Sequence, residues 1–175
     1  LFFYKHKMLP RGEKLATYQG KRQGTVVFDG PVPIPVLFEV RTARNGPWMS
    51  LTPMELLTLR AGTKLAKGTV VIAGLGLGHQ LIDVCARKQV KKIILVEHSP
   101  ELVNWLLPVI IERYAPSCEI EVLIGDAYEI LPTLTADVAL IDIFPDYGNN
   151  AHNCRRFLES SFGIKKVWCW GTAAV

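Results

Sequence analysis

The stretch TVVIAGLGLGHQLIDVCARKQVKKIILVE, residues Thr69–Glu97, decides the fold. An apolar run at Val70–Ala73 leads into a glycine-rich turn at Gly74–Gly78, and a second apolar run ends in the acid Glu97. This order predicts a strand, a turn, a helix and a second strand. Glycines allow positive φ and close backbone approach, a helix N-terminus offers free N–H groups, and a terminal carboxylate can bind ribose hydroxyls. We therefore predict a site for a nucleotide-like ligand, in preference to a purely structural unit.

The rest of the domain continues this alternation of strands and helices. Thr52, Pro53 and Glu55 combine an N-cap, a proline at the first helical position and a capping-box glutamate. Pro108 lies inside a later apolar pattern and is expected to kink or split its helix. The alternation implies an α/β fold with a doubly wound, mainly parallel sheet. The expected helices cover residues 53–66, 79–88, 150–162 and a segment that starts at Ser99, and the further strands cover residues 92–97, 119–124, 136–143 and 166–170.

The N-terminal part has a different pattern. Residues 1–24 are basic and weakly patterned, so we expect only an arm there. Thr25–Phe28 and Ile34–Thr42 are rich in β-branched and aromatic residues, and the turn residues Asp29-Gly30-Pro31 join them. These two runs predict a small β-hairpin.

Length and composition indicate one globular domain with a small appendage. The chain has 175 residues, of which 49% are hydrophobic. We expect the arm and hairpin in residues 1–48 and the ligand-binding domain in residues 49–175. No apolar run approaches the roughly 20 residues of a membrane-spanning helix, so we expect a cytoplasmic protein without a membrane partner. A chain that begins with Leu1 is compatible with a fragment of a longer protein.

Charge and cysteine content bear on whether the protein binds nucleic acid or a metal ion. Residues 1–68 carry eleven Lys or Arg and four Asp or Glu. This excess permits an anionic partner such as nucleic acid, but a solvated basic surface is the preferred interpretation. The cysteines form no C-x-x-C pair, so we expect reduced, structural thiols and no metal site. They are Cys85, Cys118, Cys154 and Cys169.

Four motifs follow the four main predicted strands: Gly74–Gly78, Val96–Pro100, Ile124–Ala127 and Ile141–Pro145. With them the chain, over roughly residues 25–171, resembles the class I S-adenosylmethionine (SAM) dependent methyltransferases. Within that fold it is similar to the spermidine-synthase-like branch, because Phe28-Asp29-Gly30 resembles the Leu-Asp-Gly of aminopropyltransferase N-terminal segments. The resemblance implies a Rossmann-like fold, shortened at the C-terminus, and SAM as cofactor.

The resemblance also implies roles for individual residues. The glycine loop would pass close to the methionine part of SAM, Glu97 would accept hydrogen bonds from the ribose hydroxyls, and Asp126 would contact the adenine amine. For Asp126, a role as the N-cap of the next helix is an equally open interpretation. His79 and His98 would lie at the edge of the pocket. The implied cofactor-binding residues are Gly74, Gly76, Gly78, Glu97, His98, Asp126 and Ala127.

The acceptor is not identified by any motif. Aminopropyltransferases carry an Asp where this chain has Leu77, and their Asp-Ser-Ser-Asp-Pro is replaced by Asp142–Asp146. We therefore expect a methyltransferase of unknown acceptor, with Asp142 first and Asp146 second as candidate catalytic bases. An aminopropyltransferase that uses decarboxylated SAM and a SAM-binding protein without turnover are the two alternatives.

The last predicted strand raises a question of assembly. Lys166–Trp170 would lie at or near the edge of the sheet and carries Trp168 and Trp170. Exposed sheet edges are normally covered. We expect the N-terminal hairpin or a second subunit of a homodimer to cover this one.

Overall fold

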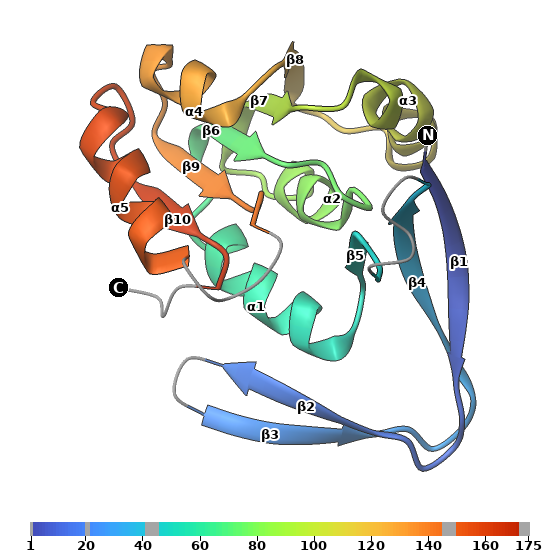
Figure 1. Cartoon of the computed structure of the whole chain (residues 1–175). Helices are drawn as coiled ribbons and strands as arrows, with labels where there is room; N and C mark the ends of the chain where they lie inside the picture. Colours follow the sequence, from blue (N-terminus) through green and yellow to red (C-terminus); the bar gives the residue numbers. More distant parts are fainter. Residues whose placement is uncertain (1, 20–21, 41–45, 145–149, 172–175) are drawn as a thin grey trace. The chain divides into compact units, whose positions relative to one another are not determined.

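The computed structural model describes residues 2–19, 22–40, 46–144 and 150–171 (Figure 1). The chain divides into two compact units, Leu1–Arg60 and Ala61–Val175, and each is described by itself. Asp146 lies outside the described residues.

The first unit is built from antiparallel strands. Strand β4 pairs along its whole length with β1 and also pairs with the short β5, while β2 and β3 form a separate two-stranded ribbon. Leu9, Ile34 and Val36 form a small buried cluster between β1 and β4. The strands are β1 (Phe2–Leu9), β2 (Lys14–Gln19), β3 (Arg22–Val27), β4 (Val32–Glu39) and β5 (Met49–Ser50).

Antiparallel strands at the N-terminus are confirmed, but the expected pairing of the two runs around Asp29-Gly30-Pro31 is wrong. These residues connect β3 to β4, which belong to different sheets. The N–H of Gly12 donates to the Phe28 carbonyl, and the N–H of Phe28 donates to the Glu13 carbonyl, which extends the β2–β3 ladder instead. The expected unpatterned arm also supplies β1 and β2. Which strands pair is decided by these long ladders, because a local turn signal fixes only the loop.

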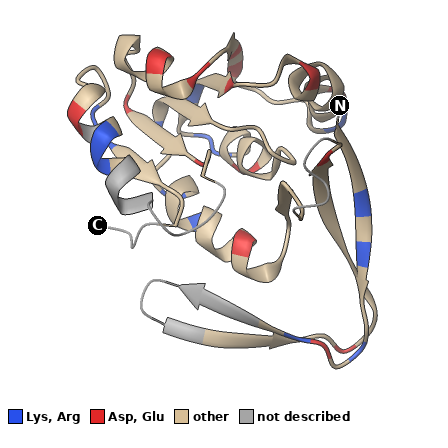
Figure 2. Cartoon of the chain, viewed as in Figure 1, with Lys and Arg blue, Asp and Glu red and all other residues tan. Residues whose placement is uncertain are grey.

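Lys5 and Lys7 of β1 are both exposed. Figure 2 colours the positions of Lys and Arg along the chain, including those on β1. The ammonium of Lys5 lies over the ring of Phe3, 5.4 Å from its centroid. Such a contact suits a solvated basic surface as well as an anion-binding one. An anionic partner therefore stays a prediction.

The second unit contains the predicted parallel sheet, with strand order β10-β9-β6-β7-β8 and every neighbouring pair parallel. Helices lie on both faces (Figure 1). This confirms the α/β, doubly wound fold, because the strand order reverses at β6. Helix α1 (Pro53–Thr63) begins in the first unit and ends in the second. The other elements of the second unit are β6 (Gly68–Ala73), α2 (His79–Cys85), β7 (Val90–Glu97), α3 (Pro100–Tyr114), β8 (Glu119–Ile124), α4 (Ala127–Ile130), the 3-10 helix η2 (Leu131–Thr133), β9 (Val138–Ile141), α5 (Asn150–Ser160) and β10 (Val167–Cys169).

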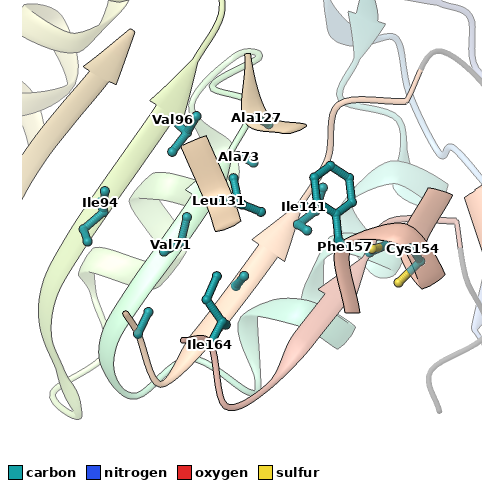
Figure 3. Close-up of a cluster of buried hydrophobic side chains, with 13 residues drawn as sticks. Val71, Ala73, Ile94, Val96, Ala127, Leu131, Ile141, Cys154, Phe157 and Ile164 are labelled. Carbon is teal, nitrogen blue, oxygen red and sulfur yellow. The ribbon is translucent and has the colours of Figure 1, made fainter. Parts of the chain in front are cut away.

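Side chains alternate between the two faces of this sheet. On one face, Val71, Ile94 and Ile141 pack with Leu131 of η2 and Phe157 of α5 in the main hydrophobic core (Figure 3). The alternate strand residues point to the opposite face, as Val70, Ile72, Ile93 and Leu95 do, and all four are fully buried. The buried residues Leu81 and Val84 of α2 are absent from the first core, so α2 packs on this opposite face.

Of two predictions made from local sequence signals in the helices, one is confirmed and one is partly wrong. Thr52 caps α1, since its Oγ1 accepts a hydrogen bond from the N–H of Glu55 at 3.3 Å. A kink or a split was expected at Pro108: the split does not occur, because α3 runs through Pro108 as one helix, and the kink stays a prediction. Asn104 and Pro108 are both exposed, so the carbonyl that loses its N–H partner can bond to water.

The strand β10 is the end of the five-stranded sheet, as expected. Trp168 is nevertheless buried, and the glycine at position 62 of α1 lies directly against its indole ring. The proposed homodimer stays a prediction. No helix in the described ranges is both long and apolar enough to cross a membrane.

Candidate functional site

The glycine loop begins where β6 ends. Gly74, Gly76 and Gly78 have φ values of 95°, 52° and 78°, which lie in the left-handed region that favours glycine. The N–H of Gly74 donates to the Val96 carbonyl at 2.9 Å, and the N–H of Gly78 donates to the Leu75 carbonyl at 2.8 Å. The sequence-predicted loop therefore forms a tight turn at the carboxyl end of β6 and leads into α2.

Close packing requires a glycine at position 74 and disfavours a side chain at position 78. A Cβ on Gly74 would collide with the main-chain oxygen of Asp142, and a Cβ on Gly78 would collide with the Ile110 side chain of α3. The loop is thus held between the end of β9 on one side and α3 on the other. Any side chain at either position would displace these neighbours.

Glu97 ends β7 and is only 7% exposed. Its Oε2 accepts a hydrogen bond from the N–H of Leu75 at 2.7 Å, and its Oε1 accepts one from the N–H of Ser99 at 2.8 Å. The carboxylate therefore ties the glycine loop to the residue that caps α3. Sequence reasoning missed this structural role, because a turn 22 residues away in the chain supplies one of the two donors.

These two hydrogen bonds do not use the full accepting capacity of the Glu97 carboxylate. Each oxygen of an ionised carboxyl group has two lone pairs, so Glu97 can accept two further hydrogen bonds. The predicted ribose contact is therefore compatible with the structural role.

Asp142 follows β9 and lies across β6 from Glu97. The register places Ala73 opposite both Val96 and Ile141, and the N–H of Asp142 donates to the Ala73 carbonyl at 2.9 Å. Val96 and Ile141 face the main core. By alternation, Glu97 and Asp142 therefore face the opposite side of the sheet, where α2 packs.

The carboxyl group of Asp142 lies in a poorly solvated position. Burial raises its pKa to about 7. Within the described part of the chain, no hydrogen bond offsets this loss of hydration for the Asp142 side chain. Near neutral pH the group can therefore both hold and release a proton.

The turn after β8 completes this edge of the sheet. The N–H of Gly125 donates to the Glu97 carbonyl at 3.0 Å. Asp126 is exposed, and its Oδ1 accepts a hydrogen bond from the N–H of Tyr128 at 2.8 Å. The N-cap interpretation of Asp126 is thus confirmed, and its adenine contact stays a prediction. Ala127 is buried at the start of α4.

The two histidines lie near the loop in sequence but have different surroundings. His79 opens α2, and its Nε2 lies 3.4 Å from Asp83 Oδ2 one helical turn later. His98 is exposed in the bend between Glu97 and Ser99. His98 is therefore adjacent to the candidate site through Glu97, whereas His79 contacts Asp83 within its own helix.

Sequence reasoning missed Gln80. This side chain is 6% exposed, and neither its Oε1 nor its Nε2 has a hydrogen-bond partner among the described residues. The sequence did contain a signal for it: Gln80 is a polar residue on the otherwise apolar face of α2 formed by Leu81, Val84 and Cys85.

The carboxyl edge therefore gathers a glycine loop, two carboxyl groups on one sheet face, and a capped turn. Ligands of open α/β sheets bind at this edge, beside the strand where the order reverses. The groups can accept hydrogen bonds from hydroxyl and amine donors and offer backbone N–H groups to an anion. No cluster of three or more metal-ligating side chains occurs in the residues that the structure covers.

No protein-family model matches the sequence, and no curated protein matches it. Solved structures are similar in fold. A methyltransferase from Geobacter sulfurreducens is 14% identical, with a TM-score of 0.48, over 69% of this chain and 60% of that one. A protein described as a candidate RNA methyltransferase from Pyrococcus horikoshii is 22% identical, with a TM-score of 0.45, over 68% of this chain and 60% of that one.

A precorrin 8W decarboxylase from Methanobacterium thermoautotrophicum is 18% identical, with a TM-score of 0.46. The alignment covers 63% of this chain and 56% of that one. The chain thus spans little more than half the length of such a protein. At these identities and TM-scores, the likeness concerns the arrangement of the sheet and its helices and says nothing of donor or acceptor.

Proposed function

We propose that this protein is a SAM-dependent methyltransferase of unknown acceptor. The observation that supports the proposal is the glycine loop held against the end of β6 by the buried carboxylate of Glu97. A loop fixed in this way presents its backbone to a ligand without first having to be ordered. Preorganisation of this kind is what positioning of a donor requires.

The residues present fit an adenosyl ligand. The remaining lone pairs of Glu97 suit the two ribose hydroxyls, and the exposed Asp126, at the next strand end, suits an exocyclic amine. The positive φ values of the loop favour glycine, and because glycine has no Cβ, the loop backbone can approach the ligand closely.

Asp142 is the candidate base on the acceptor side. SAM, when bound, supplies an electrophilic methyl group, so the protein's part is to align the acceptor and accept its proton if it has one to lose. A carboxyl group with a pKa of about 7 is suited to that task at neutral pH. Asp146 remains the second candidate.

Leu77 favours SAM over its decarboxylated form. An aminopropyltransferase pocket disfavours the methionine carboxylate with an acid, and this chain has Leu77 at that position. We therefore expect SAM to bind at least about tenfold more tightly than decarboxylated SAM, a difference of about 1.4 kcal/mol. Tighter binding of decarboxylated SAM would support the aminopropyltransferase alternative instead.

Calorimetric titration of the purified chain tests the proposal. Ribose recognition is best tested by changing the ligand, because Glu97 also holds the loop. We expect 5′-methylthioadenosine to bind at least about tenfold more tightly than its 2′-deoxy analogue. The analogue lacks the 2′-hydroxyl group and so loses one hydrogen bond to a charged acceptor. Equal affinities would contradict the assignment of Glu97, and no binding of any adenosyl compound would contradict the adenosyl site.

Turnover is a separate measurement. SAM labelled on its methyl group is incubated with the protein and with nucleic-acid, protein and small-molecule fractions in parallel. Transfer of label into one fraction supports the enzyme and identifies the acceptor class. Tight SAM binding without transfer to any fraction would favour the non-catalytic alternative.

A further inference from the structure

The side chain of Gln80 is a buried amide without a partner. Both Oε1 and Nε2 are inaccessible to solvent, and neither makes a hydrogen bond to any described residue. A buried polar group left unpaired lowers stability, and it calls for an explanation such as a ligand or a bound water. A hydrophobic residue would fill this position more favourably if packing were its only task.

The position of Gln80 links it to the glycine loop. It is the second residue of α2 and follows Gly78, the last residue of the loop, by two positions. It also shares the buried stripe of α2, which packs on the sheet face that carries Glu97 and Asp142. Gln80 is therefore the buried amide closest along the chain to the loop expected to meet the methionine part of the donor.

The chemistry of an amide matches an amino acid. The Oε1 atom accepts a hydrogen bond and the Nε2 group donates two, whereas an amino-acid zwitterion carries an ammonium that donates and a carboxylate that accepts. Glutamine has three rotatable side-chain bonds, so the amide can turn toward the loop. No hydrogen bond within the described chain has to break when it turns.

We infer that Gln80 is the specificity residue for the amino-acid end of the adenosyl donor, and that it distinguishes ligands with this end from ligands without it. The inference rests on the proposed adenosyl site. It assigns no chemical step to Gln80, which binds and orients the ligand. The adenosine part is left to Glu97 and Asp126.

The test compares Gln80→Met with the wild-type chain. Methionine keeps the length and flexibility of glutamine and removes both polar atoms. Two ligands are titrated by calorimetry: S-adenosylhomocysteine, which has the amino-acid end, and 5′-methylthioadenosine, which lacks it. Gln89→Met is the matched control, because Gln89 is exposed and follows α2.

We expect Gln80→Met to weaken S-adenosylhomocysteine binding about tenfold or more and to change the affinity for 5′-methylthioadenosine less than about twofold. The thermal midpoint of the ligand-free variant should stay the same or rise, because an unpaired amide is replaced by an apolar side chain. Gln89→Met should change neither affinity.

Four outcomes would overturn the inference. Equal loss of affinity for both ligands would show that Gln80 acts through the shape of the loop, and unchanged affinity for both would show that it does not act at all. Wild-type protein that binds both ligands equally well would show that the amino-acid end is not recognised, although the adenosyl site would stand. Wild-type protein that binds neither ligand would instead remove the proposed function, and the inference with it.

Discussion

The two edges of the parallel sheet differ in how many of their polar side chains have hydrogen-bond partners. At the amino edge, Asp137 Oδ2 accepts a hydrogen bond from the N–H of Thr69 at 2.9 Å, and Asp137 Oδ1 lies 2.6 Å from the ammonium of Lys165. At the carboxyl edge, Glu97 and Asp126 also accept backbone hydrogen bonds, but Asp142 and Gln80 have no such partners among the described residues. Groups with partners stabilise the fold, whereas burial of groups without partners lowers the free energy of unfolding.

The pKa values show the same contrast. The hydrogen bond from Lys165, followed by that from the Thr69 N–H, lowers the pKa of Asp137 below its usual value. Burial instead raises the pKa of Asp142 to about 7. Natural sequences depart from full polar satisfaction chiefly at functional sites. The carboxyl edge is therefore where ligand binding should be sought.

The largest effect on stability is expected from Gly74→Ala. The new Cβ would meet the main-chain oxygen of Asp142, and φ of 95° is unfavourable for alanine. Backbone strain and overpacking together should lower the free energy of unfolding by about 2–5 kcal/mol. Binding of adenosyl ligands should be lost as the loop shifts. Urea denaturation and calorimetric titration measure the two effects.

Gly12→Ala is the matched control for Gly74→Ala. Gly12 has a similar φ of 81°, but a Cβ there would meet no atom within 4 Å. Only backbone strain of about 1–2 kcal/mol is expected, and ligand affinity should not change. Equal losses of stability in the two variants would refute the close packing of Gly74 against β9.

A smaller effect of opposite sign is expected from Asp142→Asn. The pKa of Asp142 is raised in the folded chain, so the folded state keeps its proton while the unfolded state has lost it between about pH 4 and pH 7. Wild-type stability should therefore fall as the pH rises through this window. The asparagine variant lacks this dependence and should be more stable by about 1–3 kcal/mol at pH 8.

Thermal unfolding of both proteins at about pH 4 and pH 8 measures this effect. The two should be almost equally stable at the lower pH, where the wild-type carboxyl group is protonated. A constant difference at both pH values would show that Asp142 is not held in its neutral form.

The sequence predicted those features that short-range patterns determine. The glycine loop, the acid at the end of β7 and the caps at Thr52 and Asp126 were all visible in a few consecutive residues. Pairing of β3 with β2 instead of β4 was not visible, because it depends on ladders formed across the chain. The partners of Glu97 and the lack of partners for Gln80 were hidden for the same reason. Both depend on which backbone groups the fold brings into reach.

The smallest effect is expected from Asp137→Asn at the amino edge. The lowered pKa of Asp137 means that its ionised form stabilises the fold at and above about pH 4, and that this contribution is lost as the pH falls through the folded-state pKa. The variant should therefore have a slightly lower thermal midpoint than the wild type at pH 7, and the difference should shrink as the pH falls below about 4. Lys165 is mostly exposed, so added salt should reduce the difference.

Affinity for S-adenosylhomocysteine decides whether Asp137 acts on stability alone. Asp137 lies at the start of β9 and the ligand site at its end, so Asp137→Asn should leave the affinity unchanged. Its hydrogen bond to Thr69 and the clash that a Cβ on Gly68 would make with its carboxylate both place it beside the first residues of β6. A loss of affinity in a folded variant would mean that strain at the start of β6 reaches the glycine loop. The separation of a stabilising amino edge from a binding carboxyl edge would then be wrong.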